Sequence, residues 1–395
     1  MKILVINSGS SSIKYQLISI PENKVVCKGL VERIGYKNAV VHFKSDFHSV
    51  NEELSILDHQ AGLEKIADLL LDENKGVISD AEEIEAVGHR VVHGGSAFVK
   101  TTIIDSKVKE EIKSLFSLAP LHNPANLDGI VVAEKVFSSA TQVAVFDTAF
   151  HQTIPVVAHK YAIPNEFYEN NHIRLYGFHG TSHQYVSGKA IEVLAKKHSK
   201  IISIHLGNGC SMTAVKDGKS IDHSLGFGPM NGLIMGTRSG DIDQSVVLYL
   251  QQELRMTAEE VGTLLQKKSG MLGLTGMSDL RDIEIAAANG DKNAKLALEM
   301  NAYRIKKYIG SYVAIMNGLD AIVFTAGIGE NSDMIRAMVC DNMEYIGVSL
   351  DLKKNTGHVV NLKSIESADS KVKIFVIPTN EELEIARQTF ALVSL

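Results

Sequence analysis

Two stretches of this chain, about 200 positions apart, repeat one pattern: an apolar strand, a turn of small residues and a second strand. The first is Ile3–Tyr15, the second is Ile201–Ala214, and a shift of 200 positions places Gly9 on Gly209. Glycine and serine turns that follow a buried strand expose backbone N–H groups, which can hold a phosphate. We therefore interpret the repeat as an internal duplication of one phosphate-binding unit, and we expect two domains of the α/β class.

The length of the chain agrees with this duplication. A chain of 395 residues is long enough for two domains of roughly 150–200 residues each. The pattern of strands and helices restarts near residue 150. We expect a first domain at 1–150 and a second at 151–377, with the closing segment 378–395 returning to the first domain.

The spacing of apolar residues predicts the individual elements. Strands are expected at 1–20 (a hairpin), 25–33, 39–43, 84–92, 143–146, 201–216 (the second hairpin), 321–325 and 371–378, and helices at 57–71, 105–118, 127–137, 182–198, 245–254, 257–267, 291–314, 334–343 and 381–393. Two prolines and two asparagines predict an irregular loop over Ala119–Asn126, and a connection is expected over 154–167. A third strand followed by a glycine turn is expected at Ala321–Asn331.

Composition and charge exclude several classes of protein. A net charge of −6 and a pI near 6.2 provide no basic surface for nucleic acid. We find no apolar run of about 18 residues, and the chain begins with a strand rather than a signal pattern, so we expect a cytoplasmic protein that does not enter a membrane. The cysteines Cys27, Cys210 and Cys340 are expected to be reduced thiols. A reactive thiol at Cys210, in the second turn, is the alternative.

The common nucleotide-binding motifs are absent. Gly218-Lys219-Ser220 resembles the end of a P-loop, but Thr213 stands where its first glycine would be. The turn Gly207-Asn208-Gly209 is not followed by the third glycine of a dinucleotide-binding loop. A nucleotide site would therefore be built from separated glycine turns. Gly9–Lys14 offers amides, hydroxyls and an ammonium group to a polyphosphate, although an ordinary hairpin turn is the alternative.

Two arginines are candidates for binding a phosphoryl group. Arg238 lies among glycine and serine residues in Met235–Asp241, and Arg90 lies near the end of an apolar strand. A guanidinium group can donate two parallel hydrogen bonds to a phosphoryl group. Ordinary surface charges are the alternative interpretation of each arginine alone.

Carboxylates and histidines provide further candidates. Asp147 follows a strand and Glu381 begins the last helix, so both are candidates for positioning Mg²⁺ together with Asn7; capping of helices is the alternative. His179 and His183 are four residues apart, as are His89 and His93. Zinc ligation would suit this spacing, but the sequence offers no evident third ligand.

Nine strings, in order and over about 380 residues, resemble the acetate kinase family from end to end. They are N-S-G-S-S-S-I-K-Y at 7–15, G-H-R-V-V-H-G-G at 88–95, A-P-L-H-N-P-A-N at 119–126, F-D-T-A-F-H-Q at 146–152, Y-G-F-H-G-T-S-H at 176–183, H-L-G-N-G at 205–209, M-G-T-R-S-G-D at 235–241, G-I-G-E-N-S at 327–332 and I-P-T-N-E-E-L at 377–383. The resemblance implies the fold of the acetate and sugar kinase/Hsp70/actin superfamily. This fold has two ribonuclease-H-like domains, each a mixed sheet flanked by helices, with the active site in the interdomain cleft.

The resemblance also implies an activity and a set of site residues. The reaction would be the reversible transfer of the γ-phosphoryl group of ATP to acetate, with propionate as a second acid, by a homodimer that uses Mg²⁺ or, in its place, Mn²⁺. By similarity, the catalytic residues are Arg90, Asp147, His179 and Arg238; the residues at ATP or ADP are Lys14, His205, Leu206, Gly207, Asn208, Gly209, Asp279, Leu280, Arg281, Gly327, Ile328, Gly329, Glu330 and Asn331; the acyl substrate contacts Arg90, Val92, Leu121, Phe178 and Pro229; and Asn7 and Glu381 place the metal ion.

One segment departs from the family pattern and leaves alternatives open. The family usually has D-T-S-M-G-x-T-P-L-E-G-L where this chain has D-H-S-L-G-F-G-P-M-N-G-L at 222–233, so His223, Gly228 and Asn231 are unusual, and Gln244 replaces a frequent proline. These changes leave a kinase that prefers propionate or butyrate as one alternative. An actin-like ATPase without an acid substrate is the other, although such a protein has no need of Arg90, His179 or the 119–126 segment.

Overall fold

The computed structural model describes residues 1–395 and divides them into two compact units. Unit 1 consists of Met1–Phe150 and Asn380–Leu395, and unit 2 of His151–Thr379. The C-terminal segment therefore joins unit 1 at residue 380, whereas the sequence predicted 378. We find no helix that combines the length and the apolar composition needed to span a membrane.

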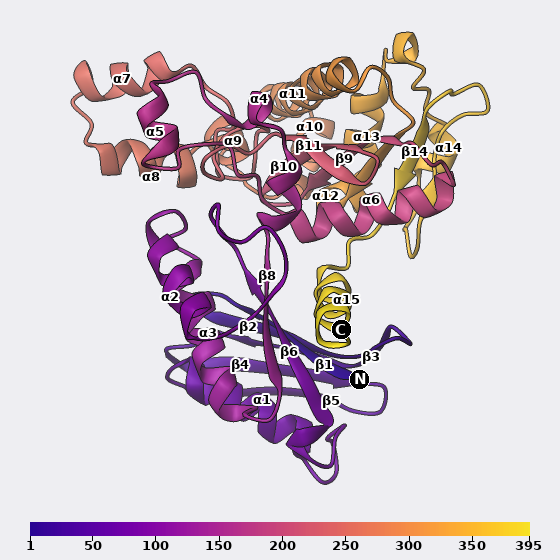
Figure 1. Cartoon of the computed structure of the whole chain (residues 1–395). Helices are drawn as coiled ribbons and strands as arrows, with labels where there is room; N and C mark the ends of the chain where they lie inside the picture. The colour runs from indigo at the N-terminus through magenta and orange to yellow at the C-terminus, as the bar shows by residue number, and fades with distance from the viewer. The chain divides into compact units, whose positions relative to one another are not determined.

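Unit 1 is built on an eight-stranded sheet with the order β5-β4-β3-β2-β1-β6-β8-β7 (Figure 1). Strand β1 pairs with β6 in parallel and β6 with β8 in parallel, while the remaining pairs are antiparallel. The strands are β1 Lys2–Ser8, β2 Ser12–Ser19, β3 Lys24–Glu32, β4 Tyr36–Ser45, β5 Ser49–Ile56, β6 Ile84–Val91, β7 Thr102–Ile103 and β8 Thr141–Phe146; the helices are α1 His59–Leu71, α2 Ser106–Ser114, α3 Asn123–Val136 and α15 Glu381–Val393, with short 3-10 turns at Ala81–Glu83 and Leu115–Ser117.

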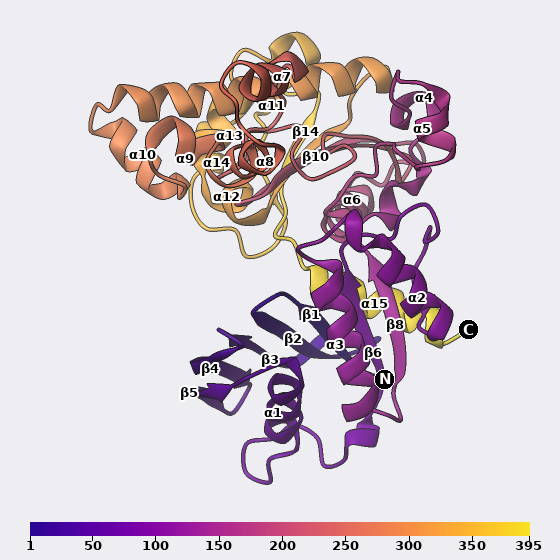
Figure 2. The ribbon, with the colours of Figure 1, turned by 90° about the vertical axis from the view of Figure 1, so that its left-hand side faces the viewer.

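Helices cover both faces of this sheet (Figure 2). One core joins apolar residues of β1 to β6 with Leu63 and Leu70 of α1 and with Phe137 at the end of α3, and it includes Val87 of β6. The next residue, Gly88, faces α15: a Cβ atom built on Gly88 would lie 2.6 Å from Thr389 Oγ1. Because successive residues of a strand point to opposite faces, α15 covers the face opposite to α1 and α3.

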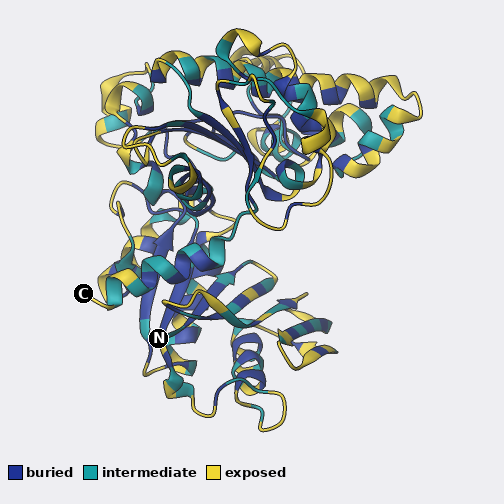
Figure 3. Cartoon of the chain, turned by 90° about the vertical axis from the view of Figure 1, so that its right-hand side faces the viewer, coloured by how far each residue is buried: buried dark blue, intermediate teal, exposed yellow.

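Unit 2 is built on a six-stranded sheet with the order β11-β10-β9-β12-β14-β13. Its strands are β9 Lys200–Leu206, β10 Cys210–Lys216, β11 Lys219–His223, β12 Ala321–Thr325, β13 Lys363–Ser364 and β14 Lys373–Val376; its helices are α4 Val156–His159, α5 Asn165–Glu169, α6 Gly180–Leu194, α7 Gln244–Gln252, α8 Ala258–Lys267, α9 Gly270–Thr275, α10 Leu280–Ala288, α11 Lys292–Met316, α12 Ala326–Asn331, α13 Asp333–Cys340 and α14 Leu352–Asn355, with 3-10 turns at Ala149–Thr153, where the units join, and Glu344–Ile346. In Figure 3 the central strands of both sheets are buried, whereas most helices pair a buried face with an exposed one.

The predicted duplication is confirmed by the strand order. The order β3-β2-β1-β6-β8-β7 of unit 1 is repeated as β11-β10-β9-β12-β14-β13, with the same alternation of parallel and antiparallel pairs. Lys2–Ser8 and Lys200–Leu206 differ by 198 positions, so the predicted shift of 200 was wrong by two. Gly9 therefore corresponds to Gly207 rather than to Gly209.

Three predicted segments differ from the structure, and prolines or glycines explain each difference. The 119–126 segment is not a loop throughout, because α3 begins at Asn123 with Pro124 in its first turn. Proline is tolerated there, since the first N–H groups of a helix have no partner within the helix. Pro155 and Pro164 likewise precede α4 and α5 within the expected connection 154–167.

The third difference concerns glycines. The expected turn after β12 is the short helix α12, which contains Gly327 and Gly329. Helix α6 begins at Gly180, two residues before the prediction, and ends at Leu194, where Ala195 adopts the left-handed conformation. Glycine alone was therefore a poor signal of a turn in this chain.

Candidate functional site

A largely buried ion pair of unit 1 joins Arg90 to Asp147. Arg90 lies on β6, and Asp147 follows β8, its parallel neighbour. Asp147 N donates to Val91 O at 3.0 Å, which holds this carboxylate at the same edge of the sheet. Arg90 Nε lies 3.1 Å from both carboxylate oxygens, and Arg90 Nη2 lies 2.7 Å from Oδ2. This two-pronged contact fixes the plane of the guanidinium group.

Glu381, at the start of α15, is a second carboxylate beside Arg90. Its Oε2 lies 4.0 Å from Arg90 Nε. Burial raises the pKa of Glu381, the attraction of Arg90 opposes this rise, and the charge of Asp147 adds to it. For Arg90, burial alone would lower the pKa, but the charges of Asp147 and Glu381 outweigh burial and raise it. The site thus contains more negative charge than its arginine compensates.

The two remaining predicted residues of unit 1 lie on the first hairpin. Asn7 and Lys14 are opposite each other on β1 and β2, and Lys14 Nζ contacts Glu382 Oε1 at 2.5 Å. An amide oxygen from Asn7 and a carboxylate from Glu381 are hard oxygen donors of the kind that Mg²⁺ accepts. A divalent cation would also offset the excess of carboxylates. The residues present therefore fit a magnesium site.

In unit 2, the turn Gly207–Gly209 connects β9 to β10, as predicted. A Cβ atom built on Gly209 would lie 3.6 Å from the Cε1 and Nε2 atoms of His179 and 3.9 Å from Arg238 Nη1. The structure therefore brings His179 and Arg238 together at this turn, although they lie far apart in the sequence. The imidazole of His179, the guanidinium of Arg238 and the backbone of the glycine turn therefore border one small space.

A loop closed by a glycine holds Arg238. Met235 N donates to Arg238 O at 3.1 Å, and Arg238 Nη1 donates to Pro229 O at 3.0 Å. Gly270, at φ +60°, packs so closely that a Cβ atom there would lie 2.2 Å from Met235 O. Burial lowers the pKa of Arg238, whose guanidinium has no carboxylate partner. Such a group is suited to pairing with a bound anion.

The histidines of α6 hydrogen-bond to serine hydroxyls. His179, the residue before α6, contacts Ser211 Oγ through Nδ1 at 2.9 Å, and His183 contacts the same hydroxyl through Nε2 at 2.7 Å. His183 Nδ1 contacts Ser203 Oγ at 2.8 Å. Hydrogen bonds thus occupy both ring nitrogens of His183, which is an argument against the alternative that this pair binds zinc.

The other histidine pair is buried in unit 1. His89 Nε2 contacts the Gln142 side chain at 2.8 Å, and burial lowers the pKa of His89 to about 4. His93 Nδ1 accepts a hydrogen bond from Gly95 N at 3.0 Å, and burial lowers its pKa to about 4 as well. Both imidazoles therefore act as neutral structural groups near the end of β6.

A cavity of about 880 Å³ lies next to the second glycine turn. Eight predicted nucleotide residues line it: Gly207, Asn208, Asp279, Leu280, Arg281, Gly327, Ile328 and Asn331. Its volume is within the range of roughly 300–1,000 Å³ found for small-molecule sites. Ser278, Glu284 and Ser332 also line it and were not predicted. Ser332 is the last residue of the string at 327–332 and Ser278 directly precedes Asp279, so their position in the sequence was the available signal.

The other predicted nucleotide residues of unit 2 do not line this cavity. His205 Nδ1 contacts Ser182 Oγ at 2.9 Å, and Leu206 lines a smaller neighbouring cavity. Glu330 Oε1 accepts a hydrogen bond from Thr379 N at 3.1 Å. Gly209 lies instead beside His179, while Gly329 packs α12 closely on the sheet, with a built Cβ atom 3.4 Å from Phe324 C.

The predicted acyl residues are divided between the units. In unit 1, Val92 N donates to Asn126 Oδ1 at 3.1 Å, and Leu121 is 60% exposed. In unit 2, Phe178 precedes His179, and Pro229 accepts the hydrogen bond from Arg238. The unusual Gly228 has open space where a side chain would begin, and Gln244 occupies the first position of α7, where proline is favourable. These two departures cause no strain.

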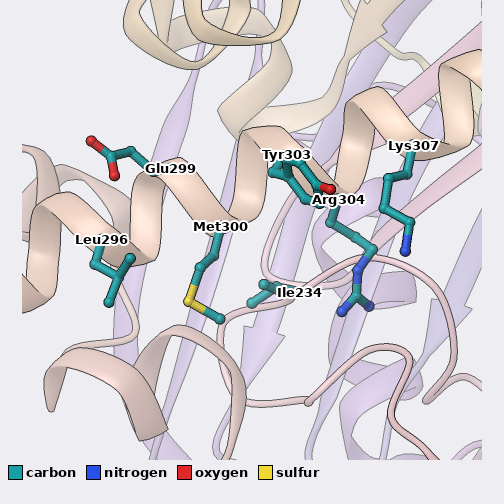
Figure 4. Close-up of a pocket in the computed structure, with 7 residues that line it drawn as sticks. All are labelled: Ile234, Leu296, Glu299, Met300, Tyr303, Arg304 and Lys307. Atoms are coloured by element: carbon teal, nitrogen blue, oxygen red, sulfur yellow. The ribbon is translucent and has the colours of Figure 1, made fainter.

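Two further features concern residues outside the predicted set, and one of them, Cys210, directly follows the second glycine turn. Cys210 is buried, and burial raises the pKa of its thiol to about 12, which disfavours the alternative of a reactive cysteine. Figure 4 shows a cavity of about 330 Å³ where Met300, Tyr303 and Arg304 of α11 face Ile234. None of its lining residues was predicted to be functional.

Comparisons with known proteins agree with the geometry of both units. The model of the acetokinase family matches residues 2–387. The chain is 61% identical over 393 residues to the acetate kinase of Flavobacterium johnsoniae, covering both chains in full, and 53% identical over 400 residues to that of Thermotoga maritima, covering 100% of this chain and 99% of that one. The crystal structure of Porphyromonas gingivalis acetate kinase matches with a TM-score of 0.94 at 44% identity, and that of a propionate kinase from Francisella tularensis with 0.92 at 44%, each covering 99% of both chains. The predicted fold class is confirmed, and the chain belongs to the acetokinase family.

Proposed function

We propose that this protein is a phosphotransferase that reversibly transfers the γ-phosphoryl group of ATP to the carboxylate of acetate. The observation that carries the proposal is the convergence of His179 and Arg238 on the Gly207–Gly209 turn, beside a cavity of nucleotide size. Family membership and full-length identity to acetate kinases support the choice of acid.

The transfer needs no strong general base. An acetate oxygen is already anionic, so it attacks the γ-phosphorus directly, and the bond to the bridging oxygen of ADP breaks with its electron pair. No proton is transferred in this step. Catalysis therefore depends on alignment and on neutralising the equatorial oxygens of the transferring group.

Named residues of each unit would perform these tasks. In unit 1, the ion pair with Asp147 uses Nε and Nη2 of Arg90, so we assign Nη1 to the acetate carboxylate. Val92, Leu121, Phe178 and Pro229 are proposed as acyl-contacting residues from the family resemblance alone. In unit 2, His179 and Arg238 would hold the transferring phosphoryl group, while the residues of the large cavity would hold the nucleoside end of ATP.

A divalent cation belongs to the proposal as well. Mg²⁺, or Mn²⁺ in its place, would be held at Asn7 and Glu381 and would neutralise phosphate oxygens when bound. Lys14, paired with Glu382, would lie near the phosphates. A homodimer and a cytoplasmic location are proposed from the family resemblance alone.

An assay of acyl phosphate formation tests the activity. The purified protein is incubated with ATP, Mg²⁺ and either acetate, propionate or butyrate. We expect the highest kcat/KM with acetate and no product without Mg²⁺. A preference for butyrate, or no turnover with any acid, would contradict the proposal. Rapid ATP hydrolysis that is independent of acid would instead favour the actin-like ATPase alternative.

A preference for propionate is the second candidate. It is favoured by the equal 44% identity to solved acetate and propionate kinases and by the changed residues around Pro229. The ratio of kcat/KM for the two acids decides between them.

A further inference from the structure

Two buried histidines hold both backbone groups of Phe178. Phe178 N donates to His223 Nε2 at 3.1 Å, and Phe178 O contacts His151 Nε2 at 2.9 Å. His223 comes from the end of β11, and His151 is the first residue of unit 2. Phe178 immediately precedes His179, which faces the glycine turn.

The backbone groups of Phe178 define the tautomer of each histidine, and a neighbouring hydroxyl group pairs with the other ring nitrogen. Because Nε2 of His223 accepts a hydrogen bond, its proton lies on Nδ1, which donates to Thr213 Oγ1 at 2.7 Å. Because Nε2 of His151 donates to a carbonyl oxygen, its Nδ1 accepts from Ser220 Oγ at 2.9 Å. Burial lowers the pKa of both histidines, that of His151 to about 4, so both imidazoles are neutral at pH 7.

Close packing leaves the segment Gly177–His179 little conformational freedom. Gly177 has φ +77°, and a Cβ atom there would lie 2.8 Å from Cγ and Cδ2 of His151 and 3.0 Å from Cδ2 of His223. The two imidazole rings lie 4.1 Å apart between their centroids. His179 itself has φ 56°, a left-handed conformation that costs a non-glycine residue about 1–2 kcal/mol. Surrounding contacts must therefore hold this segment in place.

We propose that His223, together with His151, is a positioning residue that fixes Phe178 and His179 for the reaction. This inference rests on the proposed function, in which Phe178 contacts the acyl group and His179 the phosphoryl group. Because Phe178 is one of the proposed acyl residues, the hydrogen bonds of His223 and His151 to its backbone bear on the choice of acid.

Kinetics of three variants test the inference. His223→Phe keeps a ring but removes the acceptor, His223→Gln restores an acceptor near the position of Nε2, and the exposed His198→Gln is the control. Because small misplacement of reacting groups is costly, we expect His223→Phe to lower kcat/KM for acetate about tenfold to hundredfold and to shift the acetate-to-propionate ratio. KM for ATP should stay within about twofold of wild type, and His223→Gln should recover most of the loss.

A measurement without turnover separates this inference from the proposed function. The measurement is hydrogen exchange of the Phe178 amide. This amide should exchange slowly in wild type and in His223→Gln, and faster in His223→Phe. If His223→Phe does not fold, Thr213→Val provides the second variant, because it removes the hydrogen-bond partner of His223 Nδ1. It should shift the acetate-to-propionate ratio of kcat/KM away from that of wild type. An unchanged acid ratio and unchanged exchange would overturn the inference, whereas inactivity of wild type would overturn only the proposed function.

Discussion

The two arginines of the candidate site differ in their partners. Arg90 is held by the carboxylate of Asp147, whereas Arg238 donates to a backbone oxygen and lies 3.9 Å from the sulfur of Met235. A half-buried guanidinium without a carboxylate is costly unless an anion binds there. Arg90 is therefore held in place by the protein itself, whereas we propose that Arg238 pairs with a negative charge of the substrate.

This difference leads to a prediction for Arg238. Arg238→Ala should lower kcat by about 10²-fold or more, since removal of one preorganised donor to a developing charge typically costs that much. The thermal midpoint should change little, because the arginine makes no buried ion pair. Steady-state kinetics and thermal unfolding measure the two effects. Arg255→Ala, an exposed arginine after α7, is the control, and a near-normal kcat for Arg238→Ala would remove this residue from the mechanism.

A second prediction at this scale concerns Asp222. Burial raises the pKa of this carboxyl group from 3.8 to about 6, so the folded state holds a proton that the unfolded chain releases. Ionised Asp222 therefore destabilises the fold, and this cost appears as pH rises from about 4 to above 6. Asp222→Asn keeps the acceptor for His223 N and should raise the Tm at pH 8 but not at pH 4. If Asp222→Asn changes the Tm by the same amount at pH 4 and at pH 8, the raised pKa of Asp222 is contradicted.

At the scale of elements, strand patterns were predicted better than helix starts. Both hairpins are confirmed, and Asp105, the first residue of the helix predicted at 105–118, caps α2. The prediction of a loop over 119–126 was wrong because two asparagines of this segment make long-range contacts. Asn126 Nδ2 donates to Ser8 O at 2.7 Å, and Asn123 Oδ1 accepts from His93 N at 3.0 Å. Such contacts tie α3 to the ends of β1 and β6, and no local pattern announces them.

The second glycine turn provides the prediction at this scale. Gly209 has no left-handed φ, and a Cβ atom would meet its neighbours at ordinary contact distances, so Gly209→Ala should fold normally. The added methyl group would occupy the space between the turn, His179 and Arg238, and kcat/KM for ATP should fall about tenfold or more. Gly188→Ala on α6 is the control, where nothing opposes the methyl group and stability should rise by about 0.5–1 kcal/mol. Unaltered ATP kinetics in Gly209→Ala would mean that no phosphate binds there.

At the scale of the whole molecule, the repeated strings predicted the duplication, whereas the family resemblance alone implied that most nucleotide residues lie in the second domain. Both units repeat one six-strand order, yet the large cavity occurs in unit 2, where α10 adds Asp279, Leu280 and Arg281 to the loops after β9 and β12. No helix was predicted at residues 280–288. The shift of 198 rather than 200 also required strand bounds, because an error of two positions is not evident from short strings of similar small residues.

The position of the large cavity in unit 2 predicts where a nucleotide protects the chain. At a hundred times its Kd, ADP with Mg²⁺ stabilises the bound form by about 2.7 kcal/mol, so amides that exchange only from the free form should slow about 100-fold. We expect this slowing in peptides covering 207–209, 278–284 and 327–332 of unit 2, measured by hydrogen exchange with mass spectrometry. The turn between β4 and β5 in unit 1 should not change and serves as the internal control. Gly209→Ala should reduce this protection. Protection confined to the Gly9–Ser12 turn would instead place the nucleotide in unit 1 and overturn its assignment to unit 2.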